Sequence, residues 1–396
     1  GRGGFIGQDG LNAPDSPTSV SASAGGAQAI VSFTAPTDVG GSAITGYVAT
    51  SNDGIGTAGS SSPITVTGLT NGTAYTFNVW AYNAFGYSAP SDASGSVTPI
   101  NNRGIFIGGY VSGVASNVMD YITISSSGNA TDFGDLISAT ASVSNGAAAS
   151  LTRGVVAGGL TSGGNINVIQ YVTIASTGNA SDFGDMTNVY ASMGGHSSGT
   201  RAVYGGGLKN VGSNYNNSIE YITIASTGNA QDFGDLLSDS QFASALGSST
   251  RAVFKSQNNS NVIEYITIAS TGNSTDFGDQ TQSIEAQAAA SSSTRGLFGG
   301  GYVTSGTDFS NVISYITIAS TGNASDFGDL TQGINSGSAV SDSTKYVRGG
   351  GSISGSSTNT LDSVTIASTG NASDFGDLTS SRNRLGCTCG SHGGLQ

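Results

Sequence analysis

The sequence predicts an all-β protein made of two unlike parts, a β-sandwich and a β-propeller. All six prolines lie within the first 99 residues, where short stretches of alternating apolar and polar residues are separated by Gly, Pro and Asn turns, a pattern typical of a sandwich. After residue 100 one pattern returns six times at intervals of 44 to 50 residues, which indicates propeller blades. We therefore expect an N-terminal strand or linker over 1–13, a sandwich over 14–99, and a six-bladed propeller over 102–396.

The composition is that of a folded chain with very few charges. Charged residues make up 9% of the 396 residues, against about 25% in average proteins, while 15 Tyr and 15 Phe supply apolar surface for a core. The net charge of −13 is spread along the chain without a basic cluster, which argues against nucleic acid as a partner. No apolar run approaches the roughly 18 residues that span a bilayer, so the sequence predicts no membrane insertion.

The motifs of the first part follow a known family. The stretch Val31-Ser32-Phe33-Thr34-Ala35-Pro36 is followed by Leu69-Thr70-Asn71-Gly72-Thr73-x-Tyr75-x-Phe77-x-Val79. Over 14–99 the chain resembles a fibronectin type III domain, which implies a seven-stranded sandwich. The resemblance also implies that Tyr75 belongs to the core as a tyrosine corner, its hydroxyl bonded to backbone. Trp80, the only tryptophan, is expected on a surface or half-buried strand, with a contact role as the alternative.

The most regular motif of the second part is Asp-Phe-Gly-Asp. It occurs at 132–135, 182–185, 232–235, 276–279, 326–329 and 374–377. Because it returns at blade spacing, we interpret it as structural and expect its phenylalanines to fill the core between blades. These are Phe133, Phe183, Phe233, Phe277, Phe327 and Phe375. The flanking aspartates are either ordinary turn residues or calcium ligands; we favour turns and predict no metal site.

The other parts of each repeat keep a fixed order. A strand such as Arg201-Ala202-Val203-Tyr204-Gly205-Gly206 precedes a variable loop, and an Asn-Val-Ile-x-Tyr-Ile-Thr-Ile-Ala-Ser strand follows, as at 311–320. The Asp-Phe-Gly-Asp strand and a small-residue stretch such as 285–291 complete the repeat. This order resembles the kelch repeat over 102–396, although Ile-Thr-Ile after the tyrosine and Phe in place of Trp depart from it. The resemblance implies a kelch-like propeller of four-stranded blades.

The two ends of the repeat region complement each other. The first repeat starts at the Arg103-Gly104-Ile105-Phe106 strand and lacks a preceding small-residue strand, whereas 379–396 is such a strand with nothing after it. We therefore expect the C-terminal strand to complete the first blade, which would remove exposed sheet edges.

The N-terminal segment repeats a blade motif outside the propeller. Arg2-Gly3-Gly4-Phe5-Ile6-Gly7 is similar to Arg103-Gly104-Ile105-Phe106-Ile107-Gly108. Either it is a flexible remnant of an upstream domain, or it adds as a strand to a neighbouring subunit.

The sequence predicts no catalytic residues and no cofactor. His196 and His392, the two histidines, have no acid or nucleophile beside them in sequence. Cys387 and Cys389 are spaced too closely for an ordinary disulfide framework, and they stand where other repeats have small residues. We expect them to be buried fillers. Since no nucleophile–base pair, metal cluster or carboxylate pair stands out, the chain is predicted to be non-enzymatic.

The variable loops are the candidate contact surface. The loop after the glycine-containing strand differs in every repeat, while the frame around it is constant. We expect these loops to gather at one face of the ring. The candidate contact residues are Tyr110, Lys209, Tyr215, Tyr302 and Phe309.

The combination of modules suggests a structural role. A fibronectin type III domain beside kelch-like repeats of this type resembles tail and fibre proteins of marine tailed bacteriophages. The resemblance implies a virion appendage or decoration protein, located in the virion or outside the cell and part of a homo-oligomer or larger assembly. Its partners would be protein subunits of a virion or fibre, or a host-surface glycan. The alternatives are a bacterial secreted adhesin or extracellular fibre subunit, and a polysaccharide-active propeller enzyme with Asp, Glu, Tyr and Arg clustered in its central channel.

Overall fold

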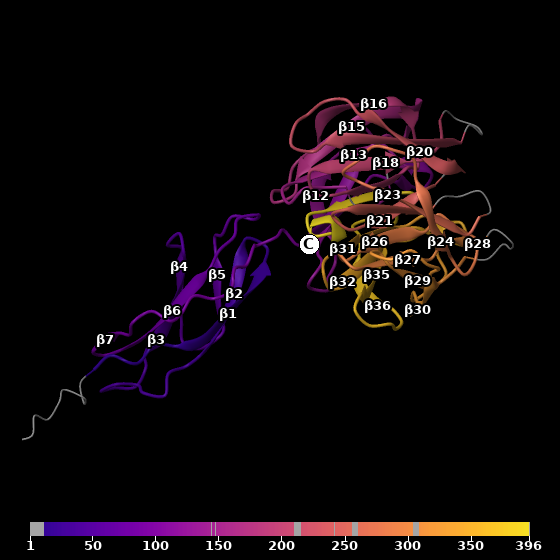
Figure 1. Ribbon diagram of the computed structural model, residues 1–396. Helices are drawn as coiled ribbons and strands as arrows, with labels where there is room; N and C mark the ends of the chain where they lie inside the picture. Colours follow the sequence, from indigo (N-terminus) through magenta and orange to yellow (C-terminus); the bar gives the residue numbers. More distant parts are fainter. Residues whose placement is uncertain are drawn as a thin grey trace, which may run out of the picture. The chain divides into compact units, whose positions relative to one another are not determined.

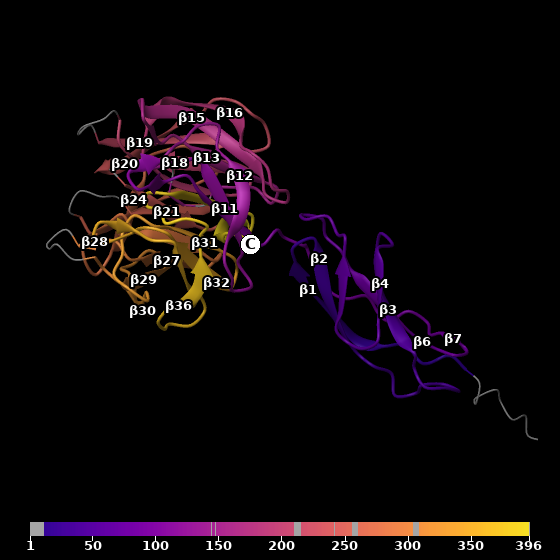
Figure 2. The ribbon, with the colours of Figure 1, turned by 180° about the vertical axis from the view of Figure 1, so that it is seen from behind.

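The chain divides into two compact units, Gly1–Asn101 and Asn102–Gln396 (Figures 1 and 2). The computed structural model describes residues 12–143, 145–146, 148–209, 215–240, 242–255, 260–303 and 309–395. Over these residues the protein is all-β apart from one 3-10 turn, η1 (Gly393–Leu395). No helix within them is long and apolar enough to cross a membrane. The proposed N-terminal connector, Arg2–Gly7, lies outside the described residues.

The first unit is a sandwich of two antiparallel sheets. One has the order β1-β2-β5 and the other β4-β3-β6-β7. The strands are β1 (Thr18–Gly25), β2 (Gln28–Thr34), β3 (Gly46–Ser51), β4 (Gly56–Gly59), β5 (Ile64–Thr67), β6 (Phe77–Asn83) and β7 (Gly86–Tyr87). Alternate residues of β2 and β6 are buried between the sheets, as the period of two in a strand requires.

Tyr75 joins the core of the first unit to its backbone. Its ring is buried among Phe77, Val79 and other apolar side chains. Its hydroxyl accepts a hydrogen bond from the backbone N–H of Thr70 at 3.0 Å, which is the contact that a tyrosine corner makes. Trp80 lies half-buried on β6, opposite Val48 of the neighbouring strand β3.

The described part of the second unit contains six larger antiparallel sheets of one design, together with three two-stranded sheets. The strand that opens each repeat is β8 (Arg103–Ile107), β13 (Arg153–Ala157), β18 (Arg201–Gly205), β22 (Arg251–Lys255), β27 (Arg295–Gly299) or β32 (Lys345–Gly349). It pairs with β11 (Val118–Thr123), β15 (Gly164–Thr173), β19 (Asn216–Thr223), β23 (Val262–Thr267), β29 (Val312–Thr317) or β35 (Thr360–Thr365). The outermost strand, which carries Asp-Phe-Gly-Asp, is β12 (Thr131–Asp135), β16 (Ser181–Tyr190), β20 (Gln231–Ser240), β24 (Thr275–Asp279), β30 (Ser325–Asp329) or β36 (Ser373–Asp377).

The innermost strands are short, made mostly of small residues, and buried. They are β17 (Gly194–Ser197), β21 (Ser244–Gly247), β26 (Ala288–Ser291), β31 (Ser338–Ser341) and β37 (Gly386–Cys389). In the second sheet Ala149 takes this place and bridges Gly154. Strand β37 comes from the C-terminus and pairs with β8, so the first sheet is built from both ends of the unit.

The innermost strands contact one another in succession around one axis. β17 contacts β21, β21 contacts β26, β26 contacts β31, and β31 contacts β37. Thr388 Oγ1 then donates to Ala148 O, and Ala149 N donates to Ser197 Oγ, which returns the path to β17. Small side chains suit this position because five strands and the segment at Ala149 approach one axis. We call this arrangement the ring.

Short strands form the variable loops. They are β9 (Tyr110–Val111), β10 (Val114–Ala115), β14 (Leu160–Thr161), β28 (Tyr302–Val303), β33 (Ser352–Ile353) and β34 (Ser356–Ser357). The short strand β25 (Ile284–Glu285), which follows β24, pairs with β28. The glycine pairs before these loops, such as Gly206 and Gly207, have φ of +73° and +95°. They directly follow the strand that opens their repeat, as Gly206 and Gly207 follow β18. There they provide the left-handed turn that leads into the loop.

The Asp-Phe-Gly-Asp motif joins each sheet to the next. Phe133 is buried against Val172 and Ile174 of the following sheet. Gly134 has φ +138°, and a Cβ there would lie 2.5 Å from the carbonyl oxygen of Gly178. The motif therefore needs Phe for the core and Gly for the close approach of the neighbouring backbone. The other five phenylalanines of the motif, Phe183, Phe233, Phe277, Phe327 and Phe375, are 2% exposed like Phe133.

A stacked Arg–Tyr pair recurs beside this contact between sheets, which we call a joint. Arg153, the first residue of β13, stacks over the Tyr171 ring at 4.4 Å and donates to the carbonyl of Ile224 in the next sheet. The same stacking is found for Arg103 on Tyr121, Arg201 on Tyr221, Arg251 on Tyr265 and Arg295 on Tyr315. In the last sheet Lys345 lies over Phe375 instead. The repeated Arg of the sequence is thus a structural residue.

Candidate contact face

One residue per repeat forms a collar at one end of the ring axis. Each lies seven positions after the last Asp of its Asp-Phe-Gly-Asp motif, and each has a left-handed backbone with φ between +49° and +60°. The collar residues are Ser142, Ser192, Phe242, Ala286, Ser336 and Arg384. Backbone hydrogen bonds link them from sheet to sheet, for example Ser142 N to Arg384 O and Arg384 N to Ser336 O. The backbone is constant around the collar, while the side chains are Ser at three positions and Phe, Ala or Arg at the other three.

The variable loops lie against this collar. The residue just before a collar position bridges the first residues of a loop, and Asn383 with Tyr110 is one such pair. The others are Ala141 with Leu160, Ala191 with Leu208, Glu285 with Tyr302, and Asn335 with Ser352. The loops of five repeats therefore meet the same end of the axis. We call this end the loop face.

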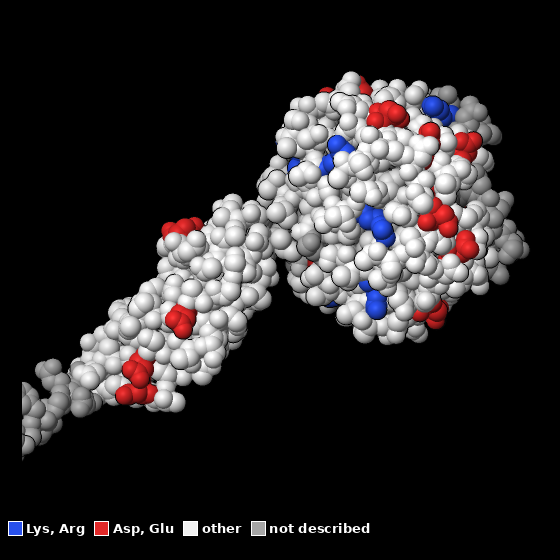
Figure 3. Space-filling view, viewed as in Figure 1, with Lys and Arg blue, Asp and Glu red and all other residues white. Residues whose placement is uncertain are grey.

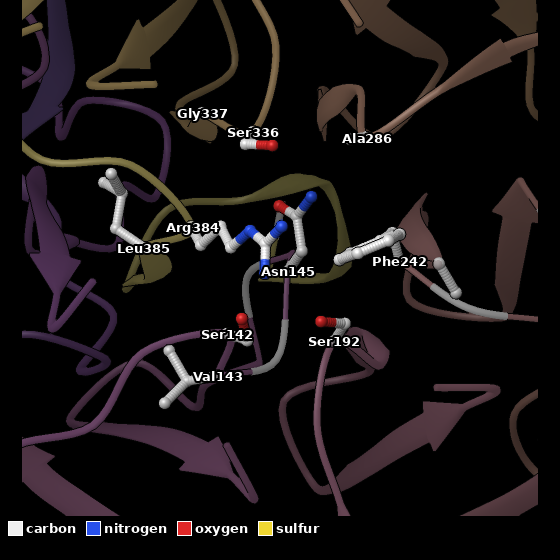
Figure 4. Close-up of a pocket in the computed structure, with 11 residues that line it drawn as sticks. Ser142, Val143, Asn145, Ser192, Phe242, Ala286, Ser336, Gly337, Arg384 and Leu385 are labelled. Atoms are coloured by element: carbon white, nitrogen blue, oxygen red, sulfur yellow. The ribbon is translucent and has the colours of Figure 1, made fainter. Parts of the chain in front are cut away.

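Side chains fill the axis at the loop face. Asn145 donates to Gln287 O and accepts from Ser338 Oγ, so it bridges three sheets. Arg384 reaches inward beside it, with its guanidinium carbon 5.3 Å from the centre of the Phe242 ring on the other side of the axis (Figure 4). The cavity left between them is about 30 Å³, close to the volume of one water.

The opposite end of the axis is closed by the C-terminal residues. The innermost strands run from the collar toward this end, where His392 Nε2 lies 3.1 Å from Ser197 Oγ. His196 packs edge-on against His392, with ring centres 5.1 Å apart. A Cβ on Gly393 would lie 2.3 Å from the carbonyl oxygens of Gly247 and Ser292. We call residues 391–395 the C-terminal plug.

The two buried histidines are held in the neutral form. Burial lowers the pKa of His196 from 6.5 to about 4, against a smaller opposing effect of its hydrogen bond to Ser248 O. Burial, followed by the neighbouring His196, lowers the pKa of His392 well below its ordinary value. The imidazoles therefore act as buried packing groups at neutral pH.

A polar groove opens on the loop face between the first and last sheets. It has a volume of about 650 Å³ and lies between the β9–β10 and β33–β34 hairpins. Its lining includes Tyr110, Ser112, Ser356, Ser357, Asn383 and Arg384. Asn383 Nδ2 donates to Ser357 Oγ at 3.0 Å, so the two sides are held together. The groove leads from the outside to Arg384 at the collar.

The sequence-predicted contact residues fall at three places on the loops. Tyr110 lines the groove. Lys209 lies half-buried with Nζ 5.8 Å from the Tyr190 ring centre, and Tyr215, which is 39% exposed, follows on the same loop. The rings of Tyr302 and Phe309 meet edge to face at 6.2 Å. The structure thus pairs these residues within loops rather than in one cluster.

Two ion pairs and two thiols are buried in the second unit. Arg348–Asp362 and Arg382–Asp120 are fully buried ion pairs. Cys387 and Cys389 are buried free thiols whose pKa burial raises, that of Cys389 to about 12, so they stay protonated. Across the described part of the chain no group of three His, Cys, Asp or Glu residues could hold a metal ion.

Arg384 and Phe242 are the residues that sequence reasoning missed. Both occupy the position seven after the motif, where the other repeats have Ser or Ala. The signal was a large side chain at a position otherwise filled by small residues. The sequence alone does not show that these six positions surround one axis; the shared left-handed backbone in the structure does.

The comparisons with known proteins bear on the first unit. Residues 15–96 match the fibronectin type III domain family. Domains A168–A170 of titin, in a crystal structure, match with 30% sequence identity and a TM-score of 0.21, covering 22% of this chain and 32% of that chain. No curated protein matches the sequence. Residues 15–96 of this all-β chain therefore form a fibronectin type III domain.

Proposed function

We propose that this protein is a non-enzymatic structural or adhesive protein that binds its partner through the loop face. In this proposal the second unit is a six-bladed, kelch-like β-propeller closed by its C-terminal strand. The observation that carries the proposal is the contrast within each repeat. The joints between sheets use nearly the same residues throughout, whereas the loops that meet at one face differ from repeat to repeat and the collar has Phe, Ala or Arg at three of its six positions.

The filled axis supports a binding role over catalysis. A propeller enzyme would be expected to present acids with Tyr or Arg in an open channel. Here Asn145 and the Arg384–Phe242 pair fill one end and the C-terminal plug fills the other. The residues described around the 30 Å³ cavity include Arg384 but no Asp or Glu. General acid–base catalysis has no titratable pair there.

The proposed setting is a virion. The fibronectin type III domain would serve as a spacer or docking module, and the loop face would meet a neighbouring subunit or a host-surface glycan. The resemblance of the whole module set to phage tail and fibre proteins supports this setting. The paucity of exposed charge also suits a surface that packs against other subunits; Figure 3 shows isolated charged side chains on a mostly uncharged face.

Locating the protein tests the proposal. Antibodies against the chain should label tails, fibres or capsid surfaces of purified virions in electron micrographs, and mass spectrometry of the same particles should detect it. Labelling of the bacterial surface without virions would instead favour the secreted adhesin. A protein found only inside cells would contradict both.

A further inference from the structure

Nine of the eleven Lys and Arg residues that the structure describes stack on aromatic rings at the joints between sheets or are buried. Six of the 12 Lys and Arg residues stack on aromatic rings at the joints between sheets: Arg103, Arg153, Arg201, Arg251, Arg295 and Lys345. Lys255, Arg348 and Arg382 are buried. Of the described cations this leaves Lys209, half-buried over Tyr190, and Arg384, which is exposed. In a chain of net charge −13, Arg384 is therefore unusual as an exposed cation at the collar, and we ask what it could bind.

The surroundings of Arg384 leave its guanidinium able to bind a ligand. Its described contact is with the Phe242 ring, which orients the planar group without using its N–H donors. The residues described around it at the collar and in the groove include no acid. An oriented Arg with available donors binds a carboxylate or sulfate through two parallel hydrogen bonds.

The groove that leads to Arg384 is suited to hydroxyl groups. Ser112, Ser356, Ser357 and Asn383 offer short side chains that both donate and accept hydrogen bonds. Tyr110 adds an aromatic ring on which a sugar ring can stack. The volume of about 650 Å³ accommodates a ligand of a few sugar rings.

From these features we infer that the groove between the β9–β10 and β33–β34 hairpins binds an acidic saccharide, with Arg384 holding the acidic group. A peptide is a poorer fit because the lining has few apolar side chains to hold its residues. The inference rests on the proposal that the loop face is the contact surface, and it names the ligand class. It does not depend on whether the protein is viral or bacterial.

Titration of labelled oligosaccharides by fluorescence anisotropy tests the inference on the full chain. The probes are oligogalacturonate, which carries carboxylates, dextran sulfate fragments of matched length, neutral dextran, and poly-glutamate. We expect one of the two acidic saccharides to bind, whichever carries the preferred acid, and neutral dextran and poly-glutamate to bind at least tenfold more weakly. Arg384→Gln should weaken acidic saccharide binding at least tenfold, and Arg384→Lys less.

Lys345→Gln is the matched control because it removes a cation that lies over Phe375 at a joint between sheets and does not line the groove. It should change affinity less than twofold, and unfolding midpoints should show that all variants are folded. The inference is overturned if neither acidic saccharide binds the native chain, if Arg384→Gln binds as well as the native chain, or if poly-glutamate binds as tightly as the saccharides. Any of these results leaves the location of the protein on virions unaffected.

Discussion

The side-chain oxygen of Asn129 accepts a hydrogen bond from the backbone N–H of Asp377 at 3.1 Å, joining residues 248 positions apart. The same bond links Asn179 to Asp135 and four further pairs around the ring. Backbone bonds from Gly128 N to Phe375 O and from Ala130 N to Asp377 O lie beside it. The contact between the last and first sheets is therefore built like the other five.

We call the contact between the last and first sheets the seam. Removing the Asn129 side chain tests whether the seam is equivalent to a joint between two consecutive sheets. Asn129→Ala should lower the free energy of unfolding by about 0.5–1.5 kcal/mol, because one backbone N–H loses its partner. Asn323→Ala, at an interior joint, is the control and should lower it by a similar amount. Urea denaturation measures both; an Asn129→Ala protein as stable as the native one beside a weakened Asn323→Ala protein would show that the seam is open.

The glycine of the Asp-Phe-Gly-Asp motif is predicted to be needed because the neighbouring backbone leaves no room for a Cβ, in addition to its need for a positive φ. Gly328→Ala would place a Cβ 2.4 Å from the carbonyl oxygen of Gly370, whereas a Cβ on Gly322 meets nothing within 4 Å. Both have φ near +150°, so strain costs each substitution about 1–3 kcal/mol. The contact should cost Gly328→Ala about 1–3 kcal/mol more. Equal unfolding midpoints for the two variants would contradict the close approach.

The hydroxyl of Tyr75 is predicted to stabilise the first unit. Tyr75→Phe deletes the acceptor of the Thr70 N–H and should lower the free energy of unfolding of that unit by about 0.5–1.5 kcal/mol. Tyr87→Phe, at a 62% exposed side chain, should leave it unchanged. Because Trp80 is the only tryptophan, its fluorescence in urea reports on this unit. No difference between the two variants would argue against the tyrosine corner.

The buried histidines predict a loss of stability in mild acid. Their folded-state pKa values lie below the unfolded value of 6.5, so the unfolded chain binds more protons as the pH falls below 6.5. Stability should therefore decrease from about pH 6.5 downward, by about 3 kcal/mol for His196 alone once the pH reaches its pKa of about 4. A variant with His196→Gln and His392→Gln should lose less stability over this range. Parallel pH profiles for the two proteins would refute the prediction.

The sequence predicted the parts that depend on repetition, and missed those that depend on where the backbone turns. Phe133 and its equivalents were assigned to the core because a motif repeated at fixed spacing has to occupy one structural position. The bond from Asp N–H to Asn Oδ1 at each joint was not predicted, since the Asn and its partner Asp belong to different repeats. Arg384 was missed because a left-handed collar position has no fixed residue type. Tyr110 was placed on a loop, but the groove beside it requires Ser356 from the far end of the chain.

Deleting residues 379–396 tests the role of the C-terminal strand. The deletion removes β37, leaving β8 with an unpaired edge, and also Arg382, whose guanidinium pairs with the buried Asp120. An unpaired edge and an unpaired buried charge both destabilise, so we expect aggregation or loss of cooperative unfolding. Light scattering and thermal denaturation report these changes.

A truncated chain that stays monomeric with an unchanged melting temperature would show that β37 is dispensable. Arg382→Met is a milder companion variant, because it leaves β37 in place while removing the charge that pairs with Asp120. It should be destabilised by about 3–5 kcal/mol, since Asp120 is left buried without its partner.

Hydrogen exchange of the intact protein tests the central claim, that the ring is closed by its own two ends and so forms a rigid frame for the loop face. Amides of β8 and β37, at the seam, should exchange as slowly as those of β27 and β26, the equivalent interior pair. Mass spectrometry of peptides covering 103–107 and 386–389 gives the seam rates, and peptides covering 295–299 and 288–291 give the reference. Seam amides that exchange many-fold faster than the interior ones would contradict the closed ring.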